Sequence, residues 1–374
     1  MPNSPLRILQ VLRAPIGGLF RHVADLSKAL AERGHQVGLV VDGSLTDART
    51  DILLADLQPH LSLGIHKLPM ARVLGMSDVT TPIRLKRLAK SLNIEVLHGH
   101  GAKGGFNARL GRPRNCVVFY TPHGGVLHFD QTKLPGKIFR QIEGLLLRRT
   151  DGIIFESTFA QKEYVAQIAQ PDCPAPVIHN GLADPEFIPI KAQKDAKDFA
   201  YIGELRGLKG VAYLLNALVG TSAPDGRPAS LVMAGDGPMR TEIEELVVSL
   251  GLTGRVELVG VRPAREVLAK GRCLVVPSLK ESLPYVVLEA SAASRPVIAT
   301  QVGGIHEIFG PTASALIRPA DENALRKSMQ AFLDDEAAAK KEAKARLAHV
   351  RTTFSLLRMT DEIETLYKRV LENS

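Results

Sequence analysis

The stretch CLVVPSLKESLPYVVLEASAASRPVIAT, residues 273–300, decides the fold class. It opens with a β-branched run (273–278), continues with an apolar segment that begins at a proline (284–291), and closes with a second β-branched run (296–300). Short strand candidates that alternate with helical patterns are typical of βαβ units and a parallel sheet. The stretch therefore predicts an α/β protein with functional side chains where strands give way to helices.

The same alternation extends over the whole chain. Further strand candidates are 6–12, 36–41, 94–100, 115–122 and 151–157 in the first half, and 199–203, 230–235 and 255–260 in the second. Helical patterns in the first half cover 18–34, 83–93, 135–150 and 158–170. Residues 181–198 are rich in Pro, Asp and Lys and lack periodicity, which indicates a linker. We predict two Rossmann-like domains, 1–180 and 199–354, joined by 181–198 and followed by a C-terminal helix at 355–374.

The composition narrows the classes of function. No apolar run approaches the roughly 20 residues that span a bilayer, and the N-terminus does not have the pattern of a signal peptide. The three scattered cysteines, Cys116, Cys173 and Cys273, argue against a disulfide framework and for a reducing compartment. Cysteine and histidine do not occur at zinc spacing, so we expect no metal.

Positive charge is concentrated in the first half of the chain. The net charge is +8, of which residues 1–185 carry +7 (22 Lys and Arg against 15 Asp and Glu). Such a surface suits an anionic partner, whether nucleic acid, a membrane surface or a phosphorylated substrate, and an ordinary solvated surface is the alternative.

Three motifs of the first half follow strand candidates. Gly17 and Gly18 precede a helix, where the backbone can approach a ligand and N–H groups are free, although a plain tight turn explains them equally well. They do not form G-x-G-x-x-G, which counts against a dinucleotide cofactor. His98 and His100 end a strand, and we favour structural or substrate-contacting roles over a metal. His123, between Pro122 and two glycines, is a stronger site candidate than a lone packed histidine.

In the second half, too, charged residues lie where strand candidates give way to helices. Arg206 and Lys209 follow a strand at the start of a helix, where cations could hold a diphosphate, unless they are ordinary charges on a solvated turn. Pro284 suits the first turn of a helix, so backbone N–H groups at 283–285 could face an anion. Glu289 could then accept hydrogen bonds from a vicinal diol and Glu281 could reach a second sugar. The alternative is that Glu281 caps the helix and Glu289 makes a surface pair.

These motifs together resemble the retaining family 4 glycosyltransferases, which have the GT-B fold. The resemblance rests on the pair Glu281-SLPYVVL-Glu289 and on the following stretch from Arg295 to Glu307. It is supported by Gly17-Gly18, by TPHGG at 121–125, by the G-x-L-x-x-x-K-G turn at 203–210 and by GDGP at 235–238. It runs nearly end to end. It implies two Rossmann-like domains facing each other across a cleft, and a last helix that could cross back to the first domain.

The resemblance also implies roles for particular residues. Glu289 is expected to bind the ribose hydroxyls. Arg206 and Lys209 are expected to bind the diphosphate. Gly18 is expected to contact the donor phosphate or the acceptor. His123 and Glu281, next to the donor sugar, are the candidates for catalysis. Gly17, Gly235, Pro284 and Tyr285 complete the expected donor site. One position departs from the family: Glu204 stands where an arginine is usual, and Arg206 could supply the lost charge.

The function implied is metal-independent transfer of a sugar, hexosyl in type, from a UDP- or GDP-sugar to a glycan or lipid-linked acceptor, with retained configuration and no cofactor. The setting implied is bacterial-type polysaccharide or lipid-linked glycan synthesis in the cytoplasm, with peripheral attachment to an anionic membrane as an option. An epimerase of the same fold and a non-catalytic nucleotide-sugar binding protein are the alternatives. A dinucleotide-dependent oxidoreductase and a nucleic-acid-binding protein are disfavoured.

Overall fold

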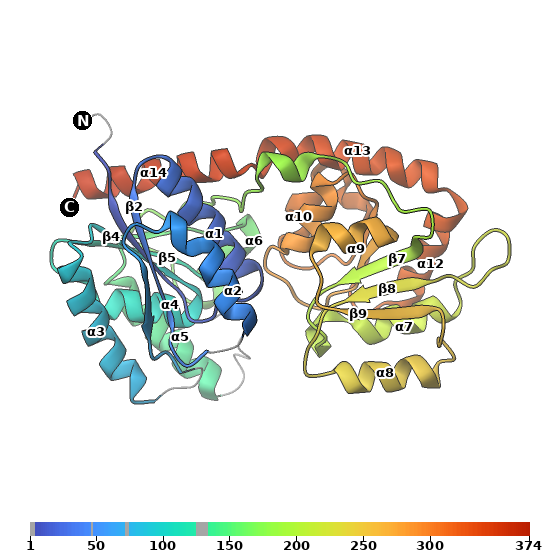
Figure 1. Ribbon diagram of the computed structural model, residues 1–374, viewed down its shortest axis with the longest axis horizontal. Helices are drawn as coiled ribbons and strands as arrows, with labels where there is room; N and C mark the ends of the chain where they lie inside the picture. Colours follow the sequence, from blue (N-terminus) through green and yellow to red (C-terminus); the bar gives the residue numbers. More distant parts are fainter. Residues whose placement is uncertain (1–3, 46–47, 72–74, 125–133) are drawn as a thin grey trace. The chain divides into compact units, whose positions relative to one another are not determined.

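The computed structural model describes residues 4–45, 48–71, 75–124 and 134–374. The chain divides into two compact units (Figure 1). The first unit contains residues 1–181 together with 356–374, and the second contains 182–355. Each unit is built on its own parallel sheet.

The first unit has a six-stranded sheet in the order β3-β2-β1-β4-β5-β6, with every neighbouring pair parallel. Its strands are β1 (Arg7–Val11), β2 (Gln36–Asp42), β3 (Ile65–Leu68), β4 (Val96–His100), β5 (Val117–Thr121) and β6 (Gly152–Ile153). Continuous β-branched runs form these strands because helices cover both faces of a parallel sheet. The strands predicted from sequence are confirmed, although β6 is only two residues long, and β3 was not predicted.

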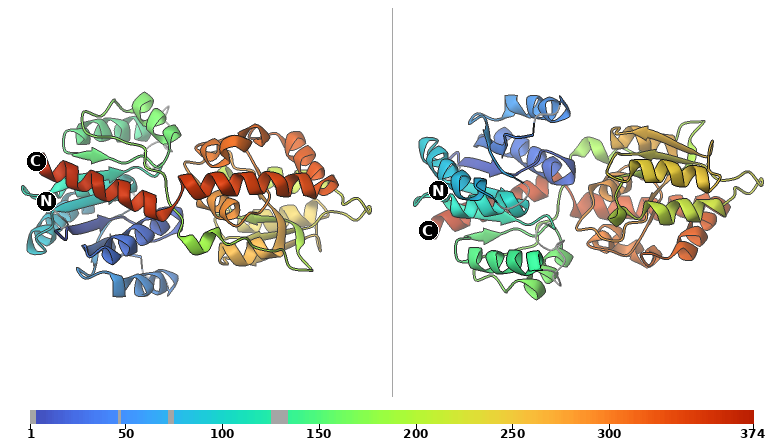
Figure 2. Two further views of the ribbon diagram at one scale, coloured as in Figure 1. Left: turned by 90° about the horizontal axis from the view of Figure 1, so that it is seen from above. Right: turned by 90° about the horizontal axis from the view of Figure 1, so that it is seen from below.

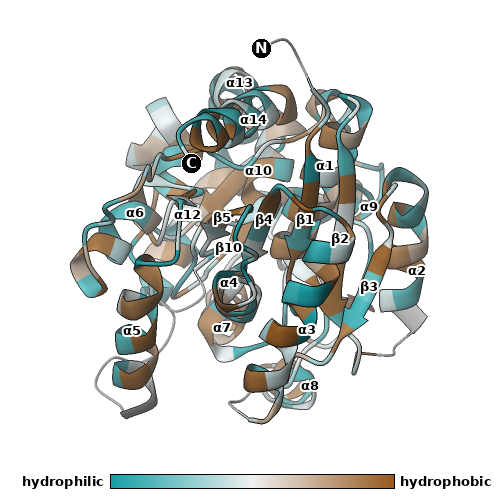
Figure 3. Cartoon of the chain, turned by 90° about the vertical axis from the view of Figure 1, so that its left-hand side faces the viewer, coloured by the Kyte–Doolittle hydropathy of each residue, from teal (hydrophilic) through white to brown (hydrophobic). Residues whose placement is uncertain are grey.

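The helices of the first unit are α1 (Gly17–Glu32), α2 (Ala48–Leu57), α3 (Ser77–Ser91), α4 (Gly101–Leu110), α5 (Leu134–Leu147), α6 (Thr158–Gln167) and α14 (Leu356–Glu372), with a 3₁₀ turn, η1 (Gln58–His60). Figure 3 shows bands of polar and apolar residues on α1, α3 and α5, as expected of helices with one buried face. None of the helices in the described part of the chain is long and apolar enough to cross a membrane.

The C-terminal helix α14 belongs to the first unit, as the sequence suggested. Helix α14, drawn in red, packs beside α1 (Figure 2). Its residues Met359, Ile363 and Tyr367 are buried in the core that also contains the apolar face of α1. Arg33, which follows α1, forms ion pairs with Asp361 and Glu364 of α14 at 2.7 and 2.8 Å. The chain therefore leaves the second unit and returns to complete the core of the first.

Helix α4 was not predicted, because its sequence, GAKGGFNARL, is rich in glycine. These glycines allow the helix to pack closely against the sheet. A Cβ at Gly104 would lie 2.2 Å from the carbonyl oxygen of Val11, and one at Gly105 would lie 2.3 Å from the Tyr120 ring. The helix thus lies against the sheet more closely than any side chain would allow, and this packing requirement overrides the low helix propensity of glycine.

The second unit has a five-stranded parallel sheet in the order β11-β10-β7-β8-β9. Its strands are β7 (Lys197–Ile202), β8 (Leu231–Ala234), β9 (Val256–Gly260), β10 (Gly271–Val276) and β11 (Val297–Ala299), all predicted from sequence. Its helices are α7 (Val211–Val219), α8 (Arg240–Ser249), α9 (Ala264–Lys270), α10 (Tyr285–Ala292), α11 (Ile305–Phe309), α12 (Glu322–Asp334) and α13 (Glu336–Thr353), with 3₁₀ turns η3 (Asp184–Phe187), η4 (Gly207–Lys209) and η5 (Gly310–Ala315). The segment 181–198, expected as a linker, packs on this unit, where Leu182 and Phe187 are buried in the core.

In each sheet the strand order reverses once, between β1 and β4 in the first unit and between β7 and β10 in the second. Ligands of open parallel sheets bind at such a switch point, outside the carboxyl ends of the strands. The segments that matter for function are therefore those that follow β1 and β4, and those that follow β7 and β10.

Candidate functional site

An ion pair bridges the two loops at the switch point of the second unit. Lys209, in the loop after β7, places its Nζ 2.6 Å from Oε1 of Glu281, in the loop after β10. The hydroxyl of Ser278 donates to the same carboxylate oxygen at 2.7 Å. The side chains of Lys209 and Glu281 are only 20% and 10% exposed, so little water competes with the pair. A cation and a carboxylate are thus fixed where a ligand of this sheet would bind.

Residues that follow β11 support the loop that carries Glu281. The hydroxyl of Thr300 donates to the carbonyl of Ser278 at 2.6 Å, and the N–H of Gly304 donates to the carbonyl of Ser282 at 2.6 Å. Gly303 has φ +58°, and a Cβ there would lie 2.4 Å from the carbonyl oxygen of Glu281. The glycines after β11 therefore allow one loop to support the other, and a side chain at Gly303 would displace the carboxylate.

Helix α10 begins at Tyr285, one residue later than Pro284 led us to expect. Pro284 has ψ 119°, which is extended, so it precedes the helix. The first N–H groups of the helix consequently start at 285, not at 283. Glu281 does not cap this helix; its carboxylate is held by Lys209 and Ser278. Glu289 lies in the second turn and is half-buried.

Arg206 is also paired with a carboxylate, but in a more exposed setting than Lys209. Its Nε lies 3.2 Å from the carboxylate of Glu204, and both side chains are well exposed. Glu204, which stands where the family has an arginine, is therefore the partner of Arg206, the cation that was expected to supply the lost charge. Gly235 serves a packing purpose: it has φ +147°, and a Cβ would lie 1.8 Å from the carbonyl oxygen of Gly203. This contact brings the loops after β7 and β8 together.

A cluster of histidines lies at the switch point of the first unit. His100 is the last residue of β4, His123 follows β5, and His22 comes from α1, which starts at Gly17 and Gly18 directly after the β1 loop. Nδ1 of His100 lies 3.2 Å from Nε2 of His123, and the ring centroids of His22 and His123 are 4.8 Å apart.

The cluster is electrically neutral; His22, His98 and His100 are buried, and His123 is half-buried. Burial lowers the pKa of His22 to about 4, and neither of its ring nitrogens has a hydrogen-bond partner among the described residues. Burial, followed by the neighbouring imidazoles, holds the pKa values of His98, His100 and His123 well below the usual range. At neutral pH these rings therefore act as hydrogen-bonding groups without charge.

His123 has an unusual backbone conformation. Its φ is +48°, in the left-handed region that residues with a side chain rarely adopt, and Gly124 follows with φ +73°. Such a conformation costs about 1–2 kcal/mol per residue and persists only where the surroundings enforce it. The turn after β5 thus places the imidazole of His123 in the cluster at the expense of local strain.

The cluster has the composition of a metal site but the bonding of a hydrogen-bond network. Ligand atoms of His22, His100 and His123 lie within 4.8 Å of one another. However, His100 and His123 are already hydrogen-bonded to each other. The N-termini of α1 and α4 also lie next to the cluster, and their positive dipole ends disfavour a cation.

Comparison with known proteins agrees with this geometry. The model of the family described as Glycosyltransferase Family 4 matches residues 16–184, and that described as Glycosyl transferases group 1 matches residues 196–335. The chain belongs to this glycosyltransferase family. Its two parallel α/β sheets form the GT-B fold.

Relatives of this glycosyltransferase have diverse activities. It is 26% identical to a glycogen synthase of Mycobacterium tuberculosis over 91% of the chain and 88% of the relative. It is 24% identical to the gpi3 subunit of the Schizosaccharomyces pombe phosphatidylinositol N-acetylglucosaminyltransferase, over 95% of the chain and 78% of the relative. The structure of Anabaena HepE in complex with UDP-glucose superimposes with a TM-score of 0.79 at 18% identity, covering 96% of this chain and 99% of that one. The last similarity shows the fold alone.

The structure of the glycosyltransferase brings together only part of the set predicted from sequence. Lys209 and Glu281 are joined, and His123 joins His100. The sequence did not single out His22 or Gln10. Its only hint was that His22 lies on the largely apolar face of α1. Residues 125–133, which include the second glycine of TPHGG, lie outside the described residues.

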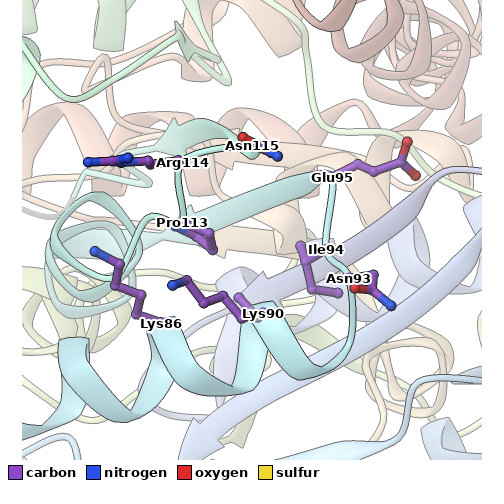
Figure 4. Close-up of a pocket in the computed structure, with 9 residues that line it drawn as sticks. Lys86, Lys90, Asn93, Ile94, Glu95, Pro113, Arg114 and Asn115 are labelled. Atoms are coloured by element: carbon purple, nitrogen blue, oxygen red, sulfur yellow. The ribbon is translucent and has the colours of Figure 1, made fainter.

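A separate pocket of about 670 Å³ lies at the opposite end of the first sheet of the glycosyltransferase, where β4 and β5 begin (Figure 4). Its floor includes the buried residues Ala89, Ile94 and Pro113. Figure 4 shows the charged ends of Lys86, Lys90 and Arg114 on one side of it. None of these three cations forms an ion pair with a described residue, so their charge is open to solvent or to an anion.

Proposed function

We propose that this chain transfers a sugar from a nucleotide-sugar donor to an acceptor hydroxyl with retention of anomeric configuration. The observation that carries the proposal is the ion pair of Lys209 and Glu281 at the switch point of the second sheet. It lies just ahead of α10, whose second turn carries Glu289. A fixed cation, a helix N-terminus and a carboxylate suit the diphosphate and ribose of one ligand.

The proposed reaction separates charge. The bond between the anomeric carbon and the phosphate oxygen breaks, the acceptor oxygen bonds to the same face of that carbon, and the acceptor proton passes to the departing phosphate. Lys209 and the N-terminus of α10 stabilise the negative charge that develops on the nucleoside diphosphate. Glu281, held by Ser278, keeps the Lys209 ammonium in place, and Glu289 accepts hydrogen bonds from the ribose hydroxyls.

The proposed chemistry needs no metal, because Lys209 and the helix N-terminus supply the positive potential that a metal would otherwise provide. A UDP-sugar is the first donor to test, since HepE was solved with UDP-glucose. A GDP-sugar is the second. We propose a hexosyl donor and a role in polysaccharide or lipid-linked glycan synthesis.

For the acceptor side we propose a peripheral position at the anionic inner face of a membrane. Helix α3 exposes the cations Arg84, Lys86, Arg87 and Lys90. The same helix exposes Val79 and Ile83, at 64% and 50%, and Met76, just ahead of it, is 80% exposed. Apolar side chains next to cations are typical of helices that lie on anionic lipid. Lys86 and Lys90 of this helix also line the pocket in Figure 4, where Arg114 adds a further cation.

A panel of UDP- and GDP-sugars, incubated with and without glycan or lipid extracts, tests the function. Release of nucleotide that depends on an extract, with the sugar recovered in the product as the same anomer, is the expected result. An epimerised donor would favour the epimerase, and binding without turnover would favour the non-catalytic alternative. The variant Glu289→Ala should weaken donor binding while the protein remains folded.

A further inference from the structure

A line of hydrogen bonds runs through the buried core of the first unit and ends at His123. Nε2 of His123 lies 3.2 Å from Nδ1 of His100. Nε2 of His100 lies 2.7 Å from Oε1 of Gln10, a residue of β1. Gln10 and His100 are 0% and 1% exposed, so water does not compete for these bonds. Each ring nitrogen of His100 has one hydrogen-bond partner. The protons on the rings of His100 and His123 can therefore be placed from these bonds.

The carboxamide oxygen of Gln10 can only accept a hydrogen bond, so Nε2 of His100 must carry the proton between them. A neutral imidazole has a single N–H, and Nδ1 of His100 therefore presents a lone pair. That lone pair needs a donor, which is the Nε2–H of His123. The remaining nitrogen of His123, Nδ1, consequently has a lone pair and no proton.

The opposite direction of donation would require the Gln10 amide to be rotated so that its NH₂ group, and not its oxygen, faced His100. In the structure Oε1 of the Gln10 amide faces Nε2 of His100 at 2.7 Å, and the NH₂ group of Gln10 has no hydrogen-bond partner among the described residues. The Tyr367 hydroxyl lies 2.6 Å from Nδ1 of His98, and Nε2 of His98 lies 2.8 Å from the Thr121 hydroxyl. The bonds that join Tyr367, His98 and Thr121 form a second line beside the one that joins His123, His100 and Gln10.

The surroundings also keep His123 neutral. The charges that act on it are those of His22, from α1, and His98, from β4, and both add to burial in lowering its pKa. A protonated ring would also carry a second N–H, on Nδ1. In the neutral ring Nδ1 is left as an acceptor, suited to a hydroxyl donor such as a sugar.

We propose that Gln10 and His100 are positioning residues that hold His123 as its Nε2–H tautomer, so that Nδ1 accepts a hydrogen bond from a substrate hydroxyl. The substrate part rests on the proposed function, whereas the tautomer does not. Proton transfer by His123 is not part of this role. The neutral ring orients the sugar and leaves the protonation of the leaving group to the acceptor.

Nitrogen-15 NMR of the full chain labelled at its histidines tests the tautomer without any substrate. The His123 signals are assigned by their loss in His123→Asn. The expected spectrum has a protonated Nε2 and an unprotonated Nδ1 on His123. In Gln10→Met, which removes the acceptor, the His123 ring should become a mixture of tautomers. Gln10→Glu keeps an acceptor at the same place and should restore the single tautomer, even if the methionine variant folds poorly.

His66 is the internal control, because its Nε2 donates to the carbonyl of Leu63 at 2.8 Å outside the cluster. Its signals should be identical in all variants. Turnover should fall in Gln10→Met, because part of the His123 population would then carry the proton on the wrong nitrogen, and should recover in Gln10→Glu. A proton on Nδ1 of wild-type His123, or an unchanged tautomer in Gln10→Met, would overturn the proposal. A correct tautomer in a protein without transferase activity would refute the proposed function alone.

Discussion

Replacing Lys209 by methionine should weaken the binding of nucleoside diphosphates. The ammonium lies 2.6 Å from Glu281 and is 20% exposed, so it is a fixed charge at the place where the phosphates are proposed to bind. Losing a hydrogen bond to a charged group costs about 1.5–3 kcal/mol. This corresponds to a dissociation constant that is roughly ten- to a hundred-fold higher. Methionine keeps the length of the side chain, so packing changes little.

The companion variant Glu281→Gln should act in the opposite direction. It retains an acceptor for the Ser278 hydroxyl but removes the carboxylate that repels a diphosphate and neutralises Lys209. Affinity for the nucleotide should therefore be unchanged or higher, while turnover falls because Lys209 is no longer held. This difference in sign separates a role in phosphate binding from a purely structural ion pair.

Titration calorimetry with UDP and with GDP provides the measurement. Lys270→Met is the matched control, since Lys270 is also paired, with Glu266 at 3.1 Å, but lies directly before β10, at the end of the strand opposite Glu281. Its affinity should equal that of the wild type. If Lys209→Met is folded and binds both nucleotides within about twofold of the wild type, the assignment of the diphosphate to Lys209 is refuted; twofold is only about 0.4 kcal/mol, well below the expected loss.

Three further outcomes are expected. Turnover should persist in excess EDTA, because the proposed charge stabilisation uses Lys209 and a helix N-terminus; complete loss that Mg²⁺ or Mn²⁺ restores would contradict this. Reversing Arg84, Lys86 and Arg87 to Glu should abolish salt-sensitive sedimentation of the full chain with anionic vesicles, since each cation near such a surface contributes about 1 kcal/mol, while UDP affinity stays constant. Arg109→Met should lower the urea concentration at the midpoint of unfolding, because buried Glu143 loses the guanidinium that binds both of its oxygens, at 2.6 and 2.8 Å. The expected loss in the free energy of unfolding is about 3–5 kcal/mol. An unchanged midpoint would show that the ion pair does not stabilise the fold.

The sequence predicted the elements whose signals are local. Alternating β-branched and amphipathic segments indicated both sheets, and the pattern at 355–374 indicated α14. The spacing of Glu281 and Glu289 across the start of a helix indicated a ligand site in the second unit. These elements can be predicted from the sequence because the pattern of apolar residues within about ten positions distinguishes a strand from a helix.

The sequence was misleading where packing overrides local preference. Glycines hid α4, because Gly104 and Gly105 are selected by close contact with the sheet and not by helix propensity. Pro284 suggested a helix start one residue too early, since its ring fixes φ but leaves ψ free to be extended.

What only the tertiary structure decided is which side chains meet. Lys209 and Glu281 are 72 residues apart, and Gln10 and His100 are 90 apart. The order of the strands brings each pair to one edge, because β7 adjoins β10 and β1 adjoins β4. The sequence favoured Lys209 over Arg206 because Glu204 stands where an arginine is usual, and the fold shows their partners: exposed Glu204 for Arg206 and buried Glu281 for Lys209. Composition and periodicity fix which segments form strands and helices, whereas charge pairing and proton positions depend on contacts between segments that are distant in the chain.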